Sequence, residues 1–428
     1  MRRDDRWLAI AFFWCVSMGL SLFAQSPGDK FWPEWRGPDA TGVSTTANPP
    51  VKWSETQNIR WKVELPGRGA STPVVWGDKL YVSTAVPVDG AGHRAQHRFL
   101  VMAFYRKDGT VAWQHTAREE APHEGTHQQF GTMASASAVT DGQHVIASFE
   151  SRGLYAFDMQ GKLIWEKDLG DKTMRNEFGE GSSPALYKDK LFVVWDHQGA
   201  SFIVALNKVT GAELWRTKRD EIDSWATPLV VEAGGEAQVV TGAMRRVRAY
   251  DADTGAIVWE TAGLTMNPIP SPVSADGLVI LMSGFRGNSL KAIRYADAKG
   301  DITGTANVVW SLDRDTPYVP SPLLYDGILY FLKSNNGLLS AYDAKTGTPH
   351  YQVQRIEAVP NIFASPVGAA GRIYLLGQQG SAAVLKHGPT LEVLATNTLE
   401  DRFDASPALV DGEMYLRGYK HLYCVAGK

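Results

Sequence analysis

The 428-residue chain is poor in cysteine, with only two in the whole sequence. Cys15 lies inside an apolar N-terminal run, so removal of that run as a leader would leave Cys424 alone, and no intramolecular disulfide could form. The chain also lacks an excess of basic residues, because its net charge is −3, and this argues against nucleic acid as a partner. We therefore expect a fold that is held together by packing alone.

Several common patterns are missing as well. The sequence has no low-complexity stretch, no run of like charges and no sustained helical periodicity after the N-terminus. It offers no convincing Ser-His-Asp order, phosphate-binding glycine loop or Cys-x-x-Cys pair. The usual signatures of serine hydrolases, nucleotide-binding proteins and dithiol chemistry are therefore excluded, and the function has to be argued from other features.

What the sequence does contain is a repeat. After residue 60, a small residue and a proline precede an apolar run, a Gly or Asp turn and a second apolar run, and this pattern occurs eight times. The anchors recur 41 to 50 residues apart after a first gap of 65. They are Pro73, Ala138 in place of proline, Pro184, Pro228, Pro272, Pro322, Pro366 and Pro407. A period in the forties with four short strands in each unit predicts an all-β propeller.

A second landmark follows the anchors: an Ala-x-Asp stretch, a Gly turn and an aromatic residue four positions after the glycine. The fullest copy is Ala249, Asp251, Thr254, Gly255 and Trp259. The Asp and Thr side chains suit a hairpin turn whose glycine takes a positive φ, and the Trp opens the outermost strand. Indole rings at one fixed place in each repeat are predicted to pack between neighbouring blades.

The two chain ends are predicted to complete one blade together. The last copy, from Ala405 to about Val425, ends before an outer strand with a Trp of its own. Trp61 has the spacing of the repeated tryptophans, but it precedes the first anchor. We therefore expect residues 59–64 to form the outer strand of a blade whose three inner strands come from the C-terminus. This closes an eight-bladed propeller of four-stranded antiparallel blades, which we place at residues 58–428.

Two segments are predicted to precede the ring. Residues 1–24 are expected to be a signal peptide, with Arg2 and Arg3 before an uncharged run and cleavage after Ala24, so that the protein is periplasmic or secreted. If the segment stays uncleaved, it would act as a membrane anchor. Residues 25–57 are expected to form a strap whose aromatic residues pack over the ring, with a carbohydrate-stacking platform as the alternative.

The Ala-x-Asp-x-x-Thr-Gly-x-x-x-Trp pattern resembles the repeat of the pyrroloquinoline-quinone (PQQ) propeller superfamily. That superfamily contains the quinoprotein alcohol dehydrogenases and the propeller lipoprotein of the outer-membrane barrel-assembly machinery. The resemblance covers about residues 50–428, and the Trp-x-x-Trp-Arg-Gly-Pro stretch at 32–38 further resembles secreted bacterial PQQ-like repeat proteins. The resemblance implies the fold and says little about the chemistry, because many functions share one fold.

The resemblance leaves three functions open. The favoured hypothesis is a monomeric binding or scaffolding module of the cell envelope that requires no cofactor and binds an envelope protein or a polar small molecule. The second is a PQQ-dependent oxidoreductase, a quinoprotein dehydrogenase with PQQ and Ca²⁺ at the axial funnel. The third is an outer-membrane assembly subunit. The family's dehydrogenases carry a vicinal Cys-Cys disulfide over the cofactor, and this chain has no adjacent cysteines.

Residues just before the inner strands, and those in the loops between the middle strands, are expected to gather on one face around the axial channel. Mixed charges and amides there suit a polar ligand or a partner, although the loop tips of any propeller are polar because they face water. No catalytic residue and no metal site is predicted. The candidate ligand-binding residues are Arg68, Glu177, Asp196, His197, Trp225, Asn267, Arg286, Tyr318, Lys333, Asn335, Asn361, Arg402 and Asp404, with His127, Glu180, Arg245, Gln378 and Arg417 in the wider set.

Three further features are interpreted as structural. The histidine-rich segment 90–131 is expected to be a solvated insertion, with a metal-binding pair as the alternative. Asp196 and His197 follow a strand and are expected to form a turn rather than an acid/base pair. Arg246 and Arg248 share one face of a strand by period-two alternation, and we expect that face to be solvated.

Overall fold

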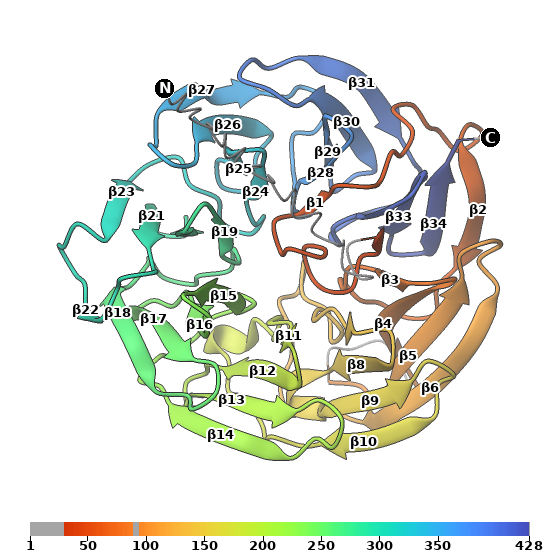
Figure 1. Cartoon of the computed structure of the whole chain (residues 1–428). Helices are drawn as coiled ribbons and strands as arrows, with labels where there is room; N and C mark the ends of the chain where they lie inside the picture. The colour runs from red at the N-terminus through yellow and green to blue at the C-terminus, as the bar shows by residue number, and fades with distance from the viewer. Residues whose placement is uncertain (1–29, 89–93, 428) are drawn as a thin grey trace, which may run out of the picture.

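The computed structural model describes residues 30–88 and 94–427, so the predicted signal peptide lies outside the described residues. Within these ranges, eight antiparallel sheets of four strands stand side by side around one axis (Figure 1). The prediction of an all-β, eight-bladed propeller is therefore confirmed. In the same ranges, no helix is long and apolar enough to cross a membrane.

Each blade is a meander whose first strand lies at the axis and whose last strand lies at the rim. Blades 1 to 4 consist of β3 (Val74–Trp76), β4 (Lys79–Pro87), β5 (His97–Tyr105), β6 (Val111–Glu120); β7 (Val139–Thr140), β8 (His144–Ser148), β9 (Leu154–Asp158), β10 (Leu163–Lys167); β11 (Ala185–Tyr187), β12 (Lys190–Trp195), β13 (Phe202–Asn207), β14 (Glu213–Lys218); and β15 (Leu229–Ala233), β16 (Glu236–Thr241), β17 (Arg246–Asp251), β18 (Ile257–Ala262).

Blades 5 to 8 repeat the plan. They consist of β19 (Val273–Ala275), β20 (Leu278–Ser283), β21 (Ser289–Arg294), β23 (Val308–Leu312); β24 (Leu323–Tyr325), β25 (Ile328–Leu332), β26 (Leu338–Asp343), β27 (Pro349–Arg355); β28 (Val367–Ala369), β29 (Arg372–Leu376), β30 (Ser381–Lys386), β31 (Val393–Thr398); and β32 (Ala408–Val410), β33 (Glu413–Arg417), β34 (His421–Ala426), β2 (Ile59–Glu64). Two short strands, β1 (Val43–Ser44) and β22 (Gly300–Asp301), add in parallel to β28 and β18, and two 3-10 turns lie at Glu150–Arg152 and Arg175–Glu177.

The chain ends meet in blade 8, as predicted. β2 pairs antiparallel with β34, with Trp61 opposite Cys424 and Glu64 opposite His421, and Figure 1 shows the red β2 beside the blue β34. Middle strands such as β8 are buried along their whole length, whereas outer strands such as β14 are mostly exposed. Neighbouring blades therefore cover both faces of the middle strands, and a single blade could not bury them.

The repeated tryptophans pack against the next blade along the ring. Trp165 of blade 2 donates its indole N–H to the carbonyl of Lys208 at 2.9 Å in blade 3. A Cβ on Gly211 would lie only 2.8 Å from the Trp165 ring. The turn glycine therefore serves both the positive φ of the turn and the indole that lies on it. The same pairing joins Trp61, Trp113, Trp215 and Trp310 to Gly109, Gly161, Gly255 and Gly347.

Trp259 departs from this pattern. It is fully buried against Ile293 and Tyr295 of blade 5, but it donates to the side chain of Gln238 at 2.8 Å in its own blade. Blade 5 carries β22 in place of the usual Gly turn, and β22 pairs with the strand that holds Trp259. Trp259 thus packs against the next blade as predicted. Its indole hydrogen bond, however, stays within its own blade.

A belt of hydrogen bonds runs around the axis at the residues that precede the proline anchors. The backbone N–H of each such residue donates to the hydroxyl of its counterpart in the next blade, as Ser137 does to Ser183 at 2.9 Å. Seven of these bonds, 2.9 to 3.2 Å long, link Thr72, Ser137, Ser183, Thr227, Ser271, Ser321, Ser365 and Ser406 in that order. Each satisfies a buried amide that would otherwise be costly.

The junction between blades 8 and 1 is held differently. The Thr72 hydroxyl has no hydrogen-bond partner among the described residues. Instead, the buried guanidinium of Arg417 in β33 donates to the Ser71 hydroxyl and the Ser83 carbonyl of blade 1. Arg106 of blade 1 in turn pairs with Glu413 of blade 8 at 2.7 Å. Arginines therefore bridge the junction at which the ring closes.

The strap crosses the axis and contacts the inner strands of most blades in turn. Trp32 pairs with Val75 of blade 1 and is fully buried, so it belongs to the core. Arg36 is also buried and donates to the carbonyls of Pro322 at 2.7 Å and Pro366 at 2.8 Å, which joins blades 6 and 7. The strap thus lies along the inner strands and ties several blades together at the axis.

The indole contact on the turn glycine can be measured against a matched glycine. Gly211 has φ +69° beside Trp165, whereas Gly277 has φ +76° and no neighbouring atom within 4 Å of the place that a Cβ would take. Both alanine variants carry the cost of a positive φ, about 1–2 kcal/mol. Gly211→Ala is expected to lose about 1–3 kcal/mol more, because the added methyl group displaces the indole. Urea unfolding of both variants measures the difference, and equal losses would show that the indole contact contributes nothing.

Candidate functional site

An axial cavity of about 280 Å³ lies among the residues that precede the inner strands. Trp35 of the strap lies at its base and donates to the Ser271 hydroxyl of the axial belt at 3.1 Å. Thr227, Ser321 and Ser365 of the same belt also line it. The belt that joins the blades therefore forms part of the cavity wall, and the ring fixes the shape of the site.

Aromatic side chains form most of the wall. Phe130 stacks on Phe363 with ring centroids 4.6 Å apart, and His127 also stacks on Phe130, with ring centroids 4.9 Å apart. Tyr318, Phe178 and Trp225 complete the aromatic part of the lining, together with Trp35 at the base. The segments that carry these rings come from different blades, so only the closed ring brings them together.

The polar groups of the lining are almost all hydrogen-bonded. The Trp225 indole donates to the Gly179 carbonyl at 2.7 Å, and the Asn335 side chain accepts the Val319 amide at 3.0 Å. Asp404 accepts from Gln378 at 2.8 Å and from the Tyr419 hydroxyl.

The exception is Asn267, which is 3% exposed and whose Oδ1 has no hydrogen-bond partner among the described residues. Its backbone takes φ +52°, a conformation that asparagine tolerates better than most residues. Burial raises the pKa of the neighbouring Tyr318 phenol above its usual value, and a hydrogen bond with the Asn267 side chain opposes that rise. A residue of the lining thus holds a buried acceptor without a donor among the described residues.

A group of four buried charges lies beside the cavity. Glu180 lines the cavity and pairs with Arg152 at 2.7 Å, and Glu150 pairs with Lys172 at 2.7 Å. Burial raises the pKa of Glu150 above its usual value, while Lys172 opposes that rise. Sequence reasoning missed Glu150, Arg152 and Lys172, since nothing in their local pattern signals burial. The group holds Glu180 in place at the wall.

The structure brings together five of the thirteen predicted ligand-binding residues. Trp225, Asn267, Tyr318, Asn335 and Asp404 line the cavity, and so do His127 and Glu180 of the wider set. Sequence reasoning missed Phe130, Phe178 and Phe363. An aromatic residue three positions before the proline anchor, as in Trp225 and Phe363, was the signal that could have found at least one of them.

Two more predicted residues lie next to the cavity without lining it. Arg68 and Arg402 lie over the ring of Tyr419, with the guanidinium carbons 4.4 and 4.6 Å from the ring centroid. Arg402 also approaches Asp404 at 3.6 Å. Burial raises the pKa of Tyr419 to about 12, and Asp404 adds to that rise. This cluster supports the wall at Asp404.

The remaining predicted residues lie away from the cavity lining. Glu177 is exposed and pairs with Arg94. Lys333 pairs with Asp315 at 2.8 Å. Arg286 lies over the Phe285 ring, and Asn361 bridges to Asn336 through the backbone. Asp196 and His197 directly follow β12 of blade 3, and both are buried.

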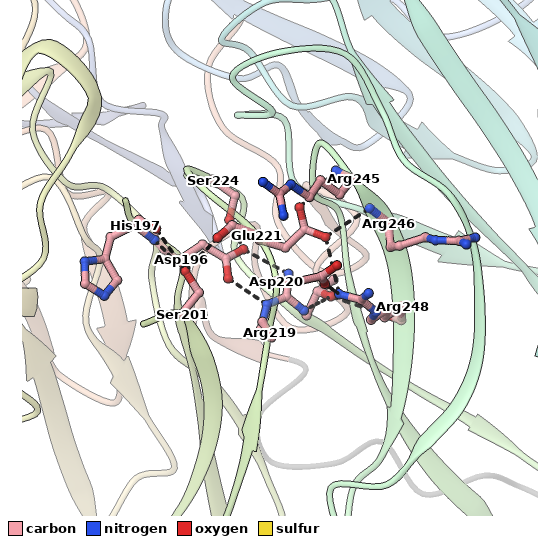
Figure 2. Close-up of polar contacts among 12 residues, drawn as sticks. Asp196, His197, Ser201, Arg219, Asp220, Glu221, Ser224, Arg245, Arg246 and Arg248 are labelled. Carbon is pink, nitrogen blue, oxygen red and sulfur yellow. Dashed lines mark hydrogen bonds and ion pairs between the residues drawn. The ribbon is translucent and has the colours of Figure 1, made fainter. Parts of the chain in front are cut away.

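Asp196 belongs to a buried ion pair. Figure 2 shows its carboxylate facing the guanidinium of Arg219, at 2.6 and 2.9 Å, with the Ser224 hydroxyl on the other side at 2.6 Å. Burial lowers the pKa of Arg219, but Asp196 more than offsets this and the net shift is upward. Both charged side chains are fully buried, so this pair fixes the loop between β12 and β13.

His197 is mostly buried and its ring points away from Asp196 (Figure 2). Its Nδ1 lies 3.1 Å from the amide of Thr173 and accepts that hydrogen bond. Burial lowers the pKa of the imidazole below its usual value, which fits a neutral ring acting as an acceptor. The geometry therefore supports a structural turn at Asp196 and His197 rather than an acid/base pair.

The face shared by Arg246 and Arg248 is less solvated than expected. Arg248 is only 7% exposed and contacts Asp220 at 2.6 Å, Glu221 at 3.4 Å and Glu260 at 2.9 Å, as Figure 2 shows for the first two. The expectation of a solvated face was wrong for Arg248, because acidic residues from the adjacent strand β18 and from the segment after β14 cover it. Period-two alternation gives the face of a strand but not what packs on it.

The cavity lining does not fit PQQ with Ca²⁺. PQQ is a tricarboxylate, and no Lys or Arg is among the cavity-lining residues in the described part of the chain, while Glu180 and Asp404 are. Within the described ranges, no group of three His, Cys, Asp or Glu residues is arranged to hold a metal ion. The charged side chains of the wall are thus acidic and would repel an anionic cofactor. A Ca²⁺ ion would also lack converging oxygen ligands.

A second cavity of about 450 Å³ lies between the strap and the inner strands of blades 3 to 5. Trp35, Thr227 and Ser271 line both cavities, so the two cavities adjoin at these residues. Glu34 lines the second cavity, and one of its oxygens accepts the Leu186 amide at 3.4 Å. Burial raises the pKa of Glu34 to about 8, against the opposing effect of that hydrogen bond.

A family model described as "Outer membrane protein assembly factor BamB" matches residues 39–202, 161–301 and 199–426 of this chain. Among curated proteins, the outer membrane protein assembly factor BamB of Yersinia pestis is 24% identical over 279 residues, which are 61% of this chain and 66% of that protein. The tetrathionate hydrolase of Acidithiobacillus ferrooxidans is 24% identical over 286 residues, 62% of this chain and 53% of that protein. The chain thus spans less than two thirds of either relative.

Solved structures share the fold. BamB from Moraxella catarrhalis aligns with a TM-score of 0.58 at 15% identity, over 86% of this chain and 99% of that one. The quinohemoprotein alcohol dehydrogenase from Comamonas testosteroni aligns with a TM-score of 0.65 at 13% identity, over 93% of this chain and 81% of that one. At these identities the likeness concerns the fold alone.

The raised pKa of Glu34 predicts a pH-dependent stability. Its folded pKa of about 8 exceeds the usual value of 4.5, so the folded state binds the proton more tightly, and stability is lost as the pH rises from about 4.5 to 8. Glu34→Gln is expected to remove this loss. The free energy of unfolding of the variant, relative to that of the wild type, is therefore expected to be higher at pH 8 than at pH 5. Urea unfolding at both pH values measures it, with exposed Glu236→Gln as the control. A constant difference between Glu34→Gln and wild type would show that Glu34 is already ionised in the fold.

Proposed function

The chain belongs to the PQQ-like repeat propeller family that carries the BamB description, and from this premise we propose that it is an exported, monomeric binding module of the cell envelope. Its axial cavity holds a polar small molecule or a group presented by a partner protein. The preformed cavity carries this proposal, because the ring, the belt and the strap fix its walls before any ligand arrives. Preorganised walls reduce the entropy lost on binding.

The polar groups of the cavity support binding rather than oxidation. Asn267 offers a buried acceptor without a partner among the described residues, and aromatic residues line the same cavity. A few placed polar groups within a mostly apolar wall are typical of ligand sites. The quinoprotein dehydrogenase hypothesis lacks support from the lining, because basic residues that would hold a tricarboxylate are not part of it.

The envelope location has separate support. The name of the Yersinia pestis relative places that protein in outer-membrane assembly, and the apolar run at 7–23 of this chain has the pattern of an export signal. An assembly subunit is therefore the second candidate function. It differs from the first in its ligand, which would be a segment of an outer-membrane protein.

The binding hypothesis predicts that PQQ is not a cofactor. Titration of the purified protein with PQQ, with and without Ca²⁺, is expected to give no saturable complex in calorimetry, because the wall offers carboxylates and no cation. Dye-linked alcohol oxidation is expected to stay at the level of the buffer. A stoichiometric PQQ complex with turnover would overturn the proposal.

The export hypothesis predicts a processed N-terminus. The full chain expressed in a Gram-negative host is expected in the periplasmic fraction, with Gln25 as its first residue by mass spectrometry of the intact protein. Leu20→Arg places a charge inside the apolar run and is expected to retain the precursor in the cytoplasm. Wild-type protein that keeps residue 1 and sediments with the inner membrane would show an uncleaved anchor instead.

A further inference from the structure

The charges that line the axial cavity all have one sign. We propose that the ligand of this cavity is an organic cation, either a free ammonium or amidinium compound or the basic side chain of a partner protein. This inference rests on the proposed function, since it names the ligand class of the same cavity. Three independent features of the wall support it.

The first feature is the placement of charge. Glu180 and Asp404 line the cavity, whereas their basic partners Arg152 and Arg402 do not. Arg152 lies 2.7 Å from Glu180, and Arg402 lies 3.6 Å from Asp404. Each acidic residue is thus part of the wall, while its guanidinium partner lies outside the lining. A cation in the cavity would meet the acidic side of both pairs, and an anion would be repelled.

The second feature is the aromatic wall. Trp225, Tyr318 and Phe178 line the cavity, and Trp35 forms its base. The face of an aromatic ring carries partial negative charge, so it attracts a cation most strongly where water is excluded. The Trp225 indole N–H already donates to the Gly179 carbonyl, which leaves the ring rather than the N–H for a ligand.

The third feature is the free acceptor. Asn267 lines the cavity and is 3% exposed, and its buried Oδ1 has no hydrogen-bond partner among the described residues. A buried acceptor without a donor is costly, and a ligand N–H would remove that cost. Ammonium and amidinium groups supply such donors together with the positive charge. Carboxylate ligands supply neither.

Three probes of one shape separate charge from size: benzamidinium, benzamide and benzoate. Calorimetric titration of the full chain is expected to give the tightest binding for benzamidinium, about tenfold or more tighter than for benzamide, and none for benzoate. Benzoate binding equal to or tighter than benzamidinium binding would overturn the cation proposal and leave the binding module standing. Absence of binding by all three would also overturn it, while the PQQ titration decides the proposed function separately.

Two variants test whether the probe enters this cavity. Asn267→Asp keeps size and tolerance of positive φ but places a carboxylate at the free acceptor, so benzamidinium is expected to bind about tenfold tighter. Gly181→Leu fills the cavity, because a Cβ there meets its nearest neighbour, the Trp225 ring, at 3.5 Å and its φ is unstrained. That variant is expected to lose benzamidinium binding at an unchanged Tm. Unchanged affinity in both variants would place the probe elsewhere and overturn the proposal.

A further pair of probes distinguishes the two sources of the cation. Blocked Gly-Arg-Gly presents a guanidinium as a partner side chain would, and blocked Gly-Gln-Gly is its neutral control. Binding of the arginine peptide at least as tight as that of benzamidinium, and lost in Gly181→Leu, supports a protein partner. Binding of benzamidinium alone supports a small free cation.

Discussion

The belt of amide-to-hydroxyl hydrogen bonds around the axis is the interaction on which the ring depends. Inner strands of two to five residues cannot hold eight blades together by their own length. Blades 1 to 7 are therefore each tied to the next blade through the residue before the proline anchor, as Ser321 is to Ser365 at 2.9 Å. Proline has no N–H to donate, so the preceding amide carries the bond. The eighth junction lacks this bond among the described residues, and buried Arg417 bridges it instead.

The same belt connects the fold to the candidate site. Thr227, Ser271, Ser321 and Ser365 contribute both to the belt and to the cavity wall. The hydroxyl bonds that join these blades therefore also position part of the cavity wall. The strap adds Trp35, which lines both this cavity and the one beside Glu34. A ligand therefore meets a wall that separate chain segments from several blades have already fixed.

Much of the fold could be predicted because its determinants repeat. The proline anchors and the turn glycines predict eight blades. Trp61 lies before the first anchor, so it predicts that the N-terminal strand completes the last blade, as the pairing of β2 with β34 shows. The site could be predicted only in part. Asn267 and Tyr318 were found because they precede inner strands, but the same rule selected Glu177, which is exposed. Asp196 lies at a strand end like other candidates, and only the position of Arg219 in space shows that it is buried and paired. Such contacts in space cannot be predicted from the local sequence pattern.

Ring closure by the two chain ends is the central claim, and hydrogen–deuterium exchange of the native protein tests it most directly. β2 and β14 are outer strands of similar length, but β14 is continuous with its blade and β2 comes from the other end of the chain. The account predicts that peptides covering β2 exchange as slowly as those covering β14, and that β2 and β34 lose protection together. Exchange of β2 at the rate of an unstructured segment, with β34 still protected, would contradict it.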